Sequence, residues 1–204
     1  MKTFIVDFEG FNLSRGFCVK ECAVLCTDNN EITHFFIRSP YHYNNLSVKD
    51  CKAVSFCEKA FHGIYWEAGR QKFSDLKNWF RENIGPNDEI HCKGLEKKCF
   101  ILNRLSIGAK VFNIEGYSNC PSFTSLSQEY INKTVIACPL PFHQTKLSCS
   151  HKKVQILAAF LADQKNEQMH SEESQLLDNS IEMLDIEKEK THNGSNSRSD
   201  ESSC

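Results

Sequence analysis

Residues 3–10 read TFIVDFEG, and the apolar run at 3–8 ends close to a glycine. Such a run predicts a buried, central β-strand. Further along the chain, residues 17–25 alternate between apolar and polar side chains, which indicates a second strand. Residues 31–38 follow the turn sequence Thr-Asp-Asn-Asn, so we expect the second and third strands to form a hairpin. The sequence therefore predicts three consecutive antiparallel strands.

The segments after the hairpin alternate between helical and strand patterns. Leu76, Trp79 and Phe80 share one face of the segment 73–84, which predicts an amphipathic helix. The other expected elements are a helix near 48–57, strands at 89–92 and 110–114, and helices at 96–105 and 149–161. The main order, β-β-β-α-β-α-β-α, excludes a simple doubly wound sheet. It resembles the ribonuclease H-like fold, an α/β domain with a mixed five-stranded sheet flanked by helices.

Composition divides the chain into a domain and a tail. The sequence contains 15 Phe, yet no aromatic residue follows Phe160, so we expect the core to end near that point. We assign residues 1–163 to the domain and 164–204 to a disordered, acidic and serine-rich tail. The tail masks a more basic domain within the net charge of −2. Its aliphatic residues at near-helical spacing either dock a protein partner or form a marginal helix without function.

The sequence predicts neither secretion nor a membrane partner. Asp7 and Glu9 interrupt the first apolar run, and no segment reaches the about 18 uncharged apolar residues of a membrane span. The 11 cysteines are an odd number, which favours reduced thiols and metal ligation over a disulfide framework. We therefore expect a cytoplasmic or nuclear protein.

Asp7 and Glu9 are the first candidate site. Residues two apart in a strand point to the same face of the sheet. Two carboxylates so close repel each other unless a cation lies between them, which is how Mg²⁺ or Mn²⁺ sites for phosphodiester cleavage are built. The alternative is that the strand simply ends in solvent.

The segment IVDFEGF, residues 5–11, resembles the first motif of the DnaQ-like, DEDD-type exonucleases. The resemblance implies that Asp7 and Glu9 are catalytic, followed by an Asp after the fourth strand and a His and an Asp on the last helix. At the later positions the chain has Glu96 and Lys97, His151 and Ile156. His151 is thus a catalytic candidate, but the missing acids imply weak metal binding and degraded catalysis.

A second candidate site lies before the last helix, where Cys138, His143 and Cys149 follow a Cys-x4-His-x5-Cys spacing. Thiolate and imidazole are preferred zinc ligands, and a structural zinc needs a fourth. Cys120 and Glu21 are both candidates for it. Ordinary buried, reduced cysteines are the alternative.

A Glu on the second strand, followed by Cys, His and Cys before the final helix, is similar to the Maelstrom domain with its Glu-Cys-His-Cys zinc motif. The resemblance implies a structural zinc ion held by Glu21, Cys138, His143 and Cys149. Such a zinc ion would tie the last helix to the sheet.

Basic residues supply candidate nucleic-acid contacts, namely Lys93, Lys152 and Lys153, although a solvated helix face explains them equally well. Three functions remain open. The domain is a zinc-stabilised, exonuclease-derived module that binds RNA or single-stranded nucleic acid, an active divalent-metal-dependent 3′–5′ exonuclease or ribonuclease, or a protein-interaction scaffold. We favour the first.

Overall fold

The computed structural model describes residues 1–105, 108–117, 120–133, 137–138 and 149–170. The chain divides into two compact units, Met1–Phe160 and Leu161–Cys204. Of the second unit, residues 161–170 are described, and they are helical. Within the described residues, no helix is both long and apolar enough to cross a membrane.

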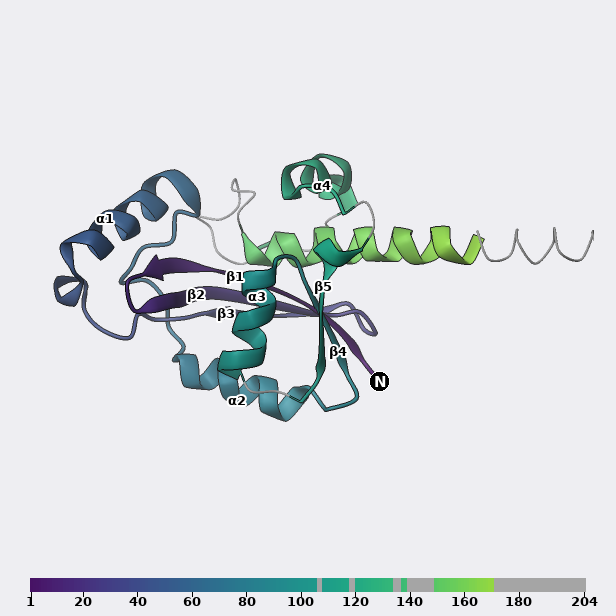
Figure 1. The fold of residues 1–204 in the computed structure, drawn as a ribbon, viewed down its shortest axis with the longest axis horizontal. Helices are drawn as coiled ribbons and strands as arrows, with labels where there is room; N and C mark the ends of the chain where they lie inside the picture. The colour runs from purple at the N-terminus through teal and green to yellow at the C-terminus, as the bar shows by residue number, and fades with distance from the viewer. Residues whose placement is uncertain (106–107, 118–119, 134–136, 139–148, 171–204) are drawn as a thin grey trace, which may run out of the picture. The chain divides into compact units, whose positions relative to one another are not determined.

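Five strands form one mixed sheet in the order β3-β2-β1-β4-β5 (Figure 1). The strands are β1 (Thr3–Leu13), β2 (Gly16–Cys26), β3 (Glu31–Phe36), β4 (Glu89–Cys92) and β5 (Lys110–Asn113). The first three pair antiparallel as a meander, whereas β4 is parallel to both β1 and β5. This arrangement confirms the predicted ribonuclease H-like α/β fold.

The β2–β3 hairpin determines which polar side chains become neighbours. Its turn, residues 27–30, ends with Asn30 in the left-handed region at φ 57°, a conformation that asparagine tolerates. With Cys26 paired to Glu31, Glu21 comes to lie opposite Phe36 and Ala23 opposite His34. His34 is therefore a diagonal cross-strand neighbour of Glu21.

The β1–β2 pairing brings the acidic residues onto the same face. Asp7 pairs with Ala23 and Glu9 with Glu21, and a bulge follows between Glu9 and Gly10. A Cβ atom at Gly10 would lie 2.1 Å from the carbonyl oxygen of Cys18, so only glycine fits there. Directly paired residues point to the same side of a sheet, and the carboxylates of β1 and β2 therefore share one face.

The opposite face carries the main hydrophobic core. Phe4, Val6 and Phe8 of β1 pack in one cluster with Leu76 and Phe80 of α2 (Phe73–Asn83). Ile101 and Leu105 of the turn η3 (Ile101–Leu105) belong to the same cluster. Burial of each such side chain contributes about 1.5–3 kcal/mol. In Figure 1, α2 lies below the strands and the first turns of the final helix, residues 150–160, lie above them.

The helices differ from the predicted set in four places. α1 (Val48–Phe56) continues into the π-helical turn η2 (Cys57–Phe61), and α3 (Leu95–Phe100) into η3. The sequence analysis did not predict α4 (Phe123–Tyr130), whose Ser- and Thr-rich segment begins with Ser122 accepting a hydrogen bond from the backbone of Ser125. The final helix covers residues 150–170, beyond the predicted end at 161.

Candidate functional site

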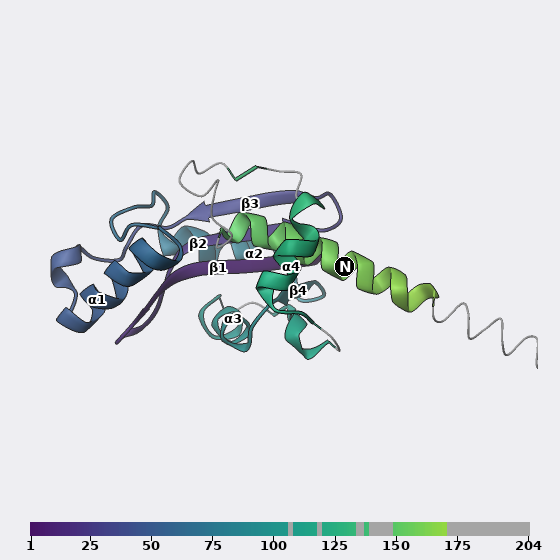
Figure 2. The ribbon, with the colours of Figure 1, turned by 90° about the horizontal axis from the view of Figure 1, so that it is seen from above.

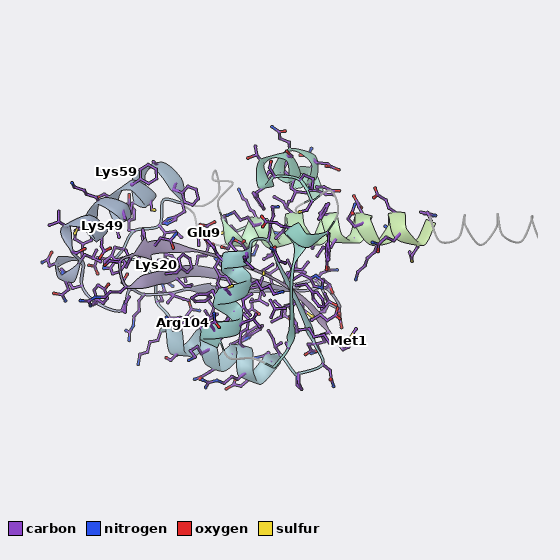
Figure 3. The ribbon with its side chains drawn as sticks, viewed as in Figure 1. Met1, Glu9, Lys20, Lys49, Lys59 and Arg104 are labelled. Carbon is purple, nitrogen blue, oxygen red and sulfur yellow. The ribbon has the colours of Figure 1, made fainter. Side chains whose placement is uncertain are left out.

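Asp7 and Glu9 are both buried and both paired with lysines. The ammonium group of Lys97 donates to Asp7 Oδ1, and that of Lys153 donates to Glu9 Oε1. Lys153 Nζ also lies 3.9 Å from Asp7 Oδ2. Asp7 is 1% exposed and Glu9 6%, so these contacts operate in a poorly hydrated environment. Figure 3 shows Glu9 next to the start of the final helix, which carries Lys153.

Charge balance explains how this acid pair can be buried. Burial alone lowers the pKa of Lys153, but the carboxylates of Asp7 and Glu9 outweigh burial, and the pKa stands above its ordinary value. Two carboxylates therefore face two ammonium groups. Removing either cation would leave a buried charge without compensation, which is far more costly than losing a surface ion pair.

A divalent metal ion does not fit this arrangement. Mg²⁺ and Mn²⁺ need carboxylate oxygens that are open to coordination, and two-metal hydrolysis needs enough of them for two ions about 4 Å apart. Here Lys97 and Lys153 place their ammonium groups on the same oxygens. Within the described residues, Asp7 Oδ2 is the one fully buried side-chain oxygen of the pair without a hydrogen-bond partner. One such oxygen does not make a two-metal site.

Glu21 organises a second buried cluster on the same face of the sheet. The donor atoms of Glu21, His34 and Cys138 all lie within 4.8 Å of one another. His34 Nε2 is 2.7 Å from Glu21 Oε1, and the Cys149 sulfur is 3.6 Å from the same oxygen. Glu21 Oε2 accepts a hydrogen bond from the backbone of Ser150, the first residue of the final helix. Four donors of types that bind zinc are thus gathered where the final helix begins.

The chemistry of this donor set fits zinc. Carboxylate oxygen, imidazole nitrogen and cysteine sulfur are all ligand types that zinc accepts, and four protein ligands complete the tetrahedral coordination of a structural site. A hydrogen bond with Cys138, burial and the charge of Glu21 raise the pKa of the Cys149 thiol, so the metal-free protein holds a protonated thiol there. Zinc binding would release that proton, because only the thiolate is a strong ligand.

The other predicted zinc ligands, His143 and Cys120, are not among the donors found around Glu21 in the described residues. His143 lies outside the described residues. The Cys120 sulfur accepts from Lys93 Nζ at 3.3 Å, and Lys93 is also 3.5 Å from Glu115, so both residues lie in another polar contact. Within the described part of the chain, Cys120 is not in the group of donors around Glu21.

His151 and the lysines of the final helix have separate surroundings. The ring of His151 lies 5.4 Å from that of His34, and its Nδ1 is 3.3 Å from Gln155 Nε2. Burial, followed by the proximity of His34, lowers the pKa of His151. Lys153 faces the acid pair, whereas the half-buried Lys152 donates its backbone N–H to the carbonyl oxygen of Cys149 at 3.1 Å.

Sequence reasoning missed His34 as a donor and missed the lysines as partners of the acid pair. The signal for His34 was present in the hairpin. Once a four-residue turn sets the register, residues 21 and 34 must be diagonal neighbours on one face. The pairing of Lys97 and Lys153 with β1 depends on how two helices pack against the sheet, and no local pattern encodes it.

A groove with a volume of about 600 Å³ opens beside the acid pair. Its polar lining includes Glu9, Lys97, Lys153 and Arg104. Four phenylalanines also line it, namely Phe8, Phe17, Phe61 and Phe100. Phe61 is 55% exposed, so its ring is accessible to a ligand in the groove. The groove therefore combines cations with aromatic surface next to the paired carboxylates.

The described residues thus form a ribonuclease H-like α/β fold with buried carboxylates on one face of its sheet. No protein-family model matches the chain, and no curated protein matches it. Among solved structures, the chain is similar to the Pan2 catalytic unit of Neurospora crassa, which comprises a protease and a nuclease domain. The identity is 12% and the TM-score 0.37, and the match covers 83% of this chain and 28% of that one. This chain therefore spans less than a third of the length of that structure.

Proposed function

We propose that this domain binds RNA or another single-stranded nucleic acid and does not hydrolyse it. The observation that carries the proposal is the pairing of Asp7 and Glu9 with Lys97 and Lys153. The position on β1 that would start a catalytic metal site is filled by ammonium groups. A lysine cannot activate a water molecule for attack on phosphorus as a metal-bound hydroxide does.

The adjoining groove supports binding. Proteins that hold single strands combine cations, which attract the phosphate backbone, with aromatic rings on which unpaired bases stack. Phe61 offers such a ring in the groove, and Arg104 offers a cation. The chemistry of the groove thus suits a single strand even though the acid pair beside it is neutralised.

We also propose a structural zinc ion held by Glu21, His34, Cys138 and Cys149. A fully protein-ligated zinc ion leaves no position for a reactive water, so its role is to stabilise the fold. The geometry around Glu21 supports His34 as a nitrogen ligand. His143, the nitrogen ligand predicted from the sequence, lies outside the described residues. The resemblance to the Maelstrom domain is consistent with a zinc ion at this place in the fold.

The test is a combined binding and cleavage assay with the full chain. Fluorescently end-labelled 12-mers of oligouridine and oligothymidine are incubated with the protein in Mg²⁺ or Mn²⁺. We expect the protein to bind the oligonucleotides and to leave them intact in either metal ion. Divalent-dependent cleavage that disappears in Asp7→Ala would establish the nuclease alternative instead.

A matched pair of variants tests the groove. Phe61→Ala removes a ring that lines it, and Phe56→Ala removes a ring that is similarly exposed, at 65%, but does not line it. We expect Phe61→Ala alone to weaken binding, by about 1–3 kcal/mol if one base stacks there. Equal affinities of both variants and the unmodified protein would contradict the assignment of the groove.

A further inference from the structure

A second groove, with a volume of about 420 Å³, lies along the end of the β1–β2 hairpin. Four cationic residues line it, namely Arg15, Arg38, Lys72 and Arg104, and its lining contains no Asp or Glu. All four cationic residues are exposed. The groove therefore has a concentrated positive charge, although the whole chain carries a formal charge of −2.

These cations differ from those at the acid pair. Within the described residues, none of the four forms an ion pair with a carboxylate, whereas Lys97 and Lys153 both do. Clustered cations without acidic partners repel one another, and an anion placed among them relieves that repulsion. Arginine is well suited to phosphate because its guanidinium donates two parallel hydrogen bonds.

The two grooves are continuous. Phe17, Phe100 and Arg104 line both of them. The ring of Phe100 packs against Phe8, Phe17 and Phe73 at centroid distances of 5.2, 5.6 and 6.1 Å. Phe8 lines the groove at the acid pair and Phe73 lines the cationic groove, so one aromatic cluster connects the two.

We propose that the cationic groove holds the phosphate backbone of a single-stranded nucleic acid whose adjoining nucleotides lie in the groove beside Asp7 and Glu9. The inference rests on the proposed function and adds the path of the strand. Aromatic rings at the base of a groove can be used only by bases that are unpaired and unstacked, so the ligand is a single strand and not a duplex. Arg15, Arg38 and Lys72 contact phosphates beyond the nucleotides at the acid pair.

Fluorescence anisotropy with the labelled oligouridine 12-mer tests this path. Arg15→Glu/Arg38→Glu reverses two charges of the cationic groove, and Lys59→Glu/Arg81→Glu makes the same change at exposed positions that line neither groove. Figure 3 shows Lys59 on the α1–η2 segment, away from Arg104 beside α3. We expect the first variant to lose about tenfold or more in affinity and the second to lose about twofold or less. Arg38→Gln should lower the slope of log affinity against log salt by about one.

Each outcome separates this inference from the proposed function. If the two double variants bind equally and Phe61→Ala still weakens binding, the path through the cationic groove is wrong and the proposed function stands. If the unmodified protein binds no oligonucleotide, both are wrong. Equal affinity for a matched duplex would overturn the single-strand assignment. Thermal melting followed by circular dichroism shows whether a double variant has unfolded. In that case Arg38→Gln, a smaller change in the same groove, provides the test.

Discussion

Two buried carboxylate clusters lie side by side on one face of the sheet, and they are compensated in different ways. Glu9 and Glu21 are direct cross-strand partners. The Asp7–Glu9 pair faces the ammonium groups of Lys97 and Lys153, whereas Glu21 faces imidazole and sulfur donors from His34, Cys138 and Cys149. The same kind of acid is thus placed in a salt-bridge cluster in one case and in a candidate metal centre in the other.

The difference shows that the partners of a carboxylate, and not its place in the fold, determine what it can do. An ammonium group has a fixed single charge and no open coordination position, so it neutralises the acid pair without providing reactive chemistry. Neutral donors leave the negative charge of Glu21 available to a cation. Under the proposed function, this ribonuclease H-like sheet keeps its first acidic motif without the conditions for hydrolysis.

Replacing Cys149, the proposed zinc ligand, should have the largest effect. We expect Cys149→Ser to lose bound zinc and to melt at least about 10 °C lower, because structural zinc binding contributes on the order of 10 kcal/mol and 1 kcal/mol corresponds to about 2–4 °C in a domain of this size. Cys99→Ser, at an exposed free cysteine, is the control. Unchanged melting and zinc content in Cys149→Ser would contradict the metal centre.

Replacing each of the two histidines by alanine tests which of them is the nitrogen ligand of the zinc ion. His34→Ala should lose zinc because His34 lies within the donor group, and His143→Ala should keep it. Zinc content and melting temperature measure both. Zinc lost from His143→Ala and retained in His34→Ala would return the nitrogen ligand to the position predicted from the sequence.

Removing the cation of Lys153 should have the next largest effect. Lys153→Met leaves Glu9 buried without its main partner, and we expect a loss of about 3–5 kcal/mol in the free energy of unfolding. Urea unfolding measures it, with Lys165→Met, at an exposed position of the final helix, as the control. Because the pKa of Lys153 is raised in the folded state, its contribution should be complete below pH 10.5 and lost as pH rises through the higher folded value. Equal stabilities of the two variants would show that the acid pair does not depend on Lys153.

Converting Lys97 to an acid should create the metal affinity that the acid pair lacks. Lys97→Asp releases Asp7 and adds a third carboxylate, so we expect Mn²⁺ to raise the melting temperature of this variant and not that of the unmodified protein. Lys98→Asp, the neighbouring position, is the control. A Mn²⁺-dependent rise in the unmodified protein would mean that the lysines do not exclude the ion.

Asp50 provides the smallest effect and a third way to compensate an acid. It accepts hydrogen bonds from the backbone and hydroxyl of Ser14, which join the β1–β2 turn to α1, and from the hydroxyl of Ser47, the residue before α1. Figure 2 shows α1 next to the β1–β2 end of the sheet. These hydrogen bonds hold the pKa of Asp50 below its ordinary 3.8. We expect Asp50→Asn to destabilise less than Lys153→Met at pH 7. The difference from the unmodified protein should disappear as pH falls through the lowered pKa, because the stabilising charge is lost there. A pH-independent difference in urea unfolding would contradict this origin.

Much of the sheet could be predicted from local pattern. The apolar run at residues 3–8, the alternation in β2 and the turn at 27–30 identified the antiparallel strands, because strand periodicity and turn chemistry are local properties. α4 was missed because its Ser- and Thr-rich sequence resembles a loop, and its buried residues, Leu126 and Tyr130 among them, become visible only in the packed fold. The final helix was predicted too short because its later turns, at residues 162–170, have few apolar residues.

The site was predicted less completely. Asp7, Glu9, Glu21, Cys138 and Cys149 were singled out from spacing and resemblance, and the structure gathers them into two clusters. Their partners could not be predicted in the same way. Lys97 is 90 residues from Asp7 and Lys153 is 144 from Glu9, so these ion pairs depend on tertiary packing. The cationic groove likewise draws residues from a turn, a strand end and two helical segments.

Metal content tests the central contrast most directly. The full chain is dialysed against buffer that contains Zn²⁺ and Mn²⁺, the free ions are removed, and bound metal is measured by mass spectrometry. We predict that the full chain retains about one zinc ion and no manganese, and that Cys149→Ser retains no zinc. Retained manganese that is lost in Asp7→Ala, or a chain without zinc, would contradict it.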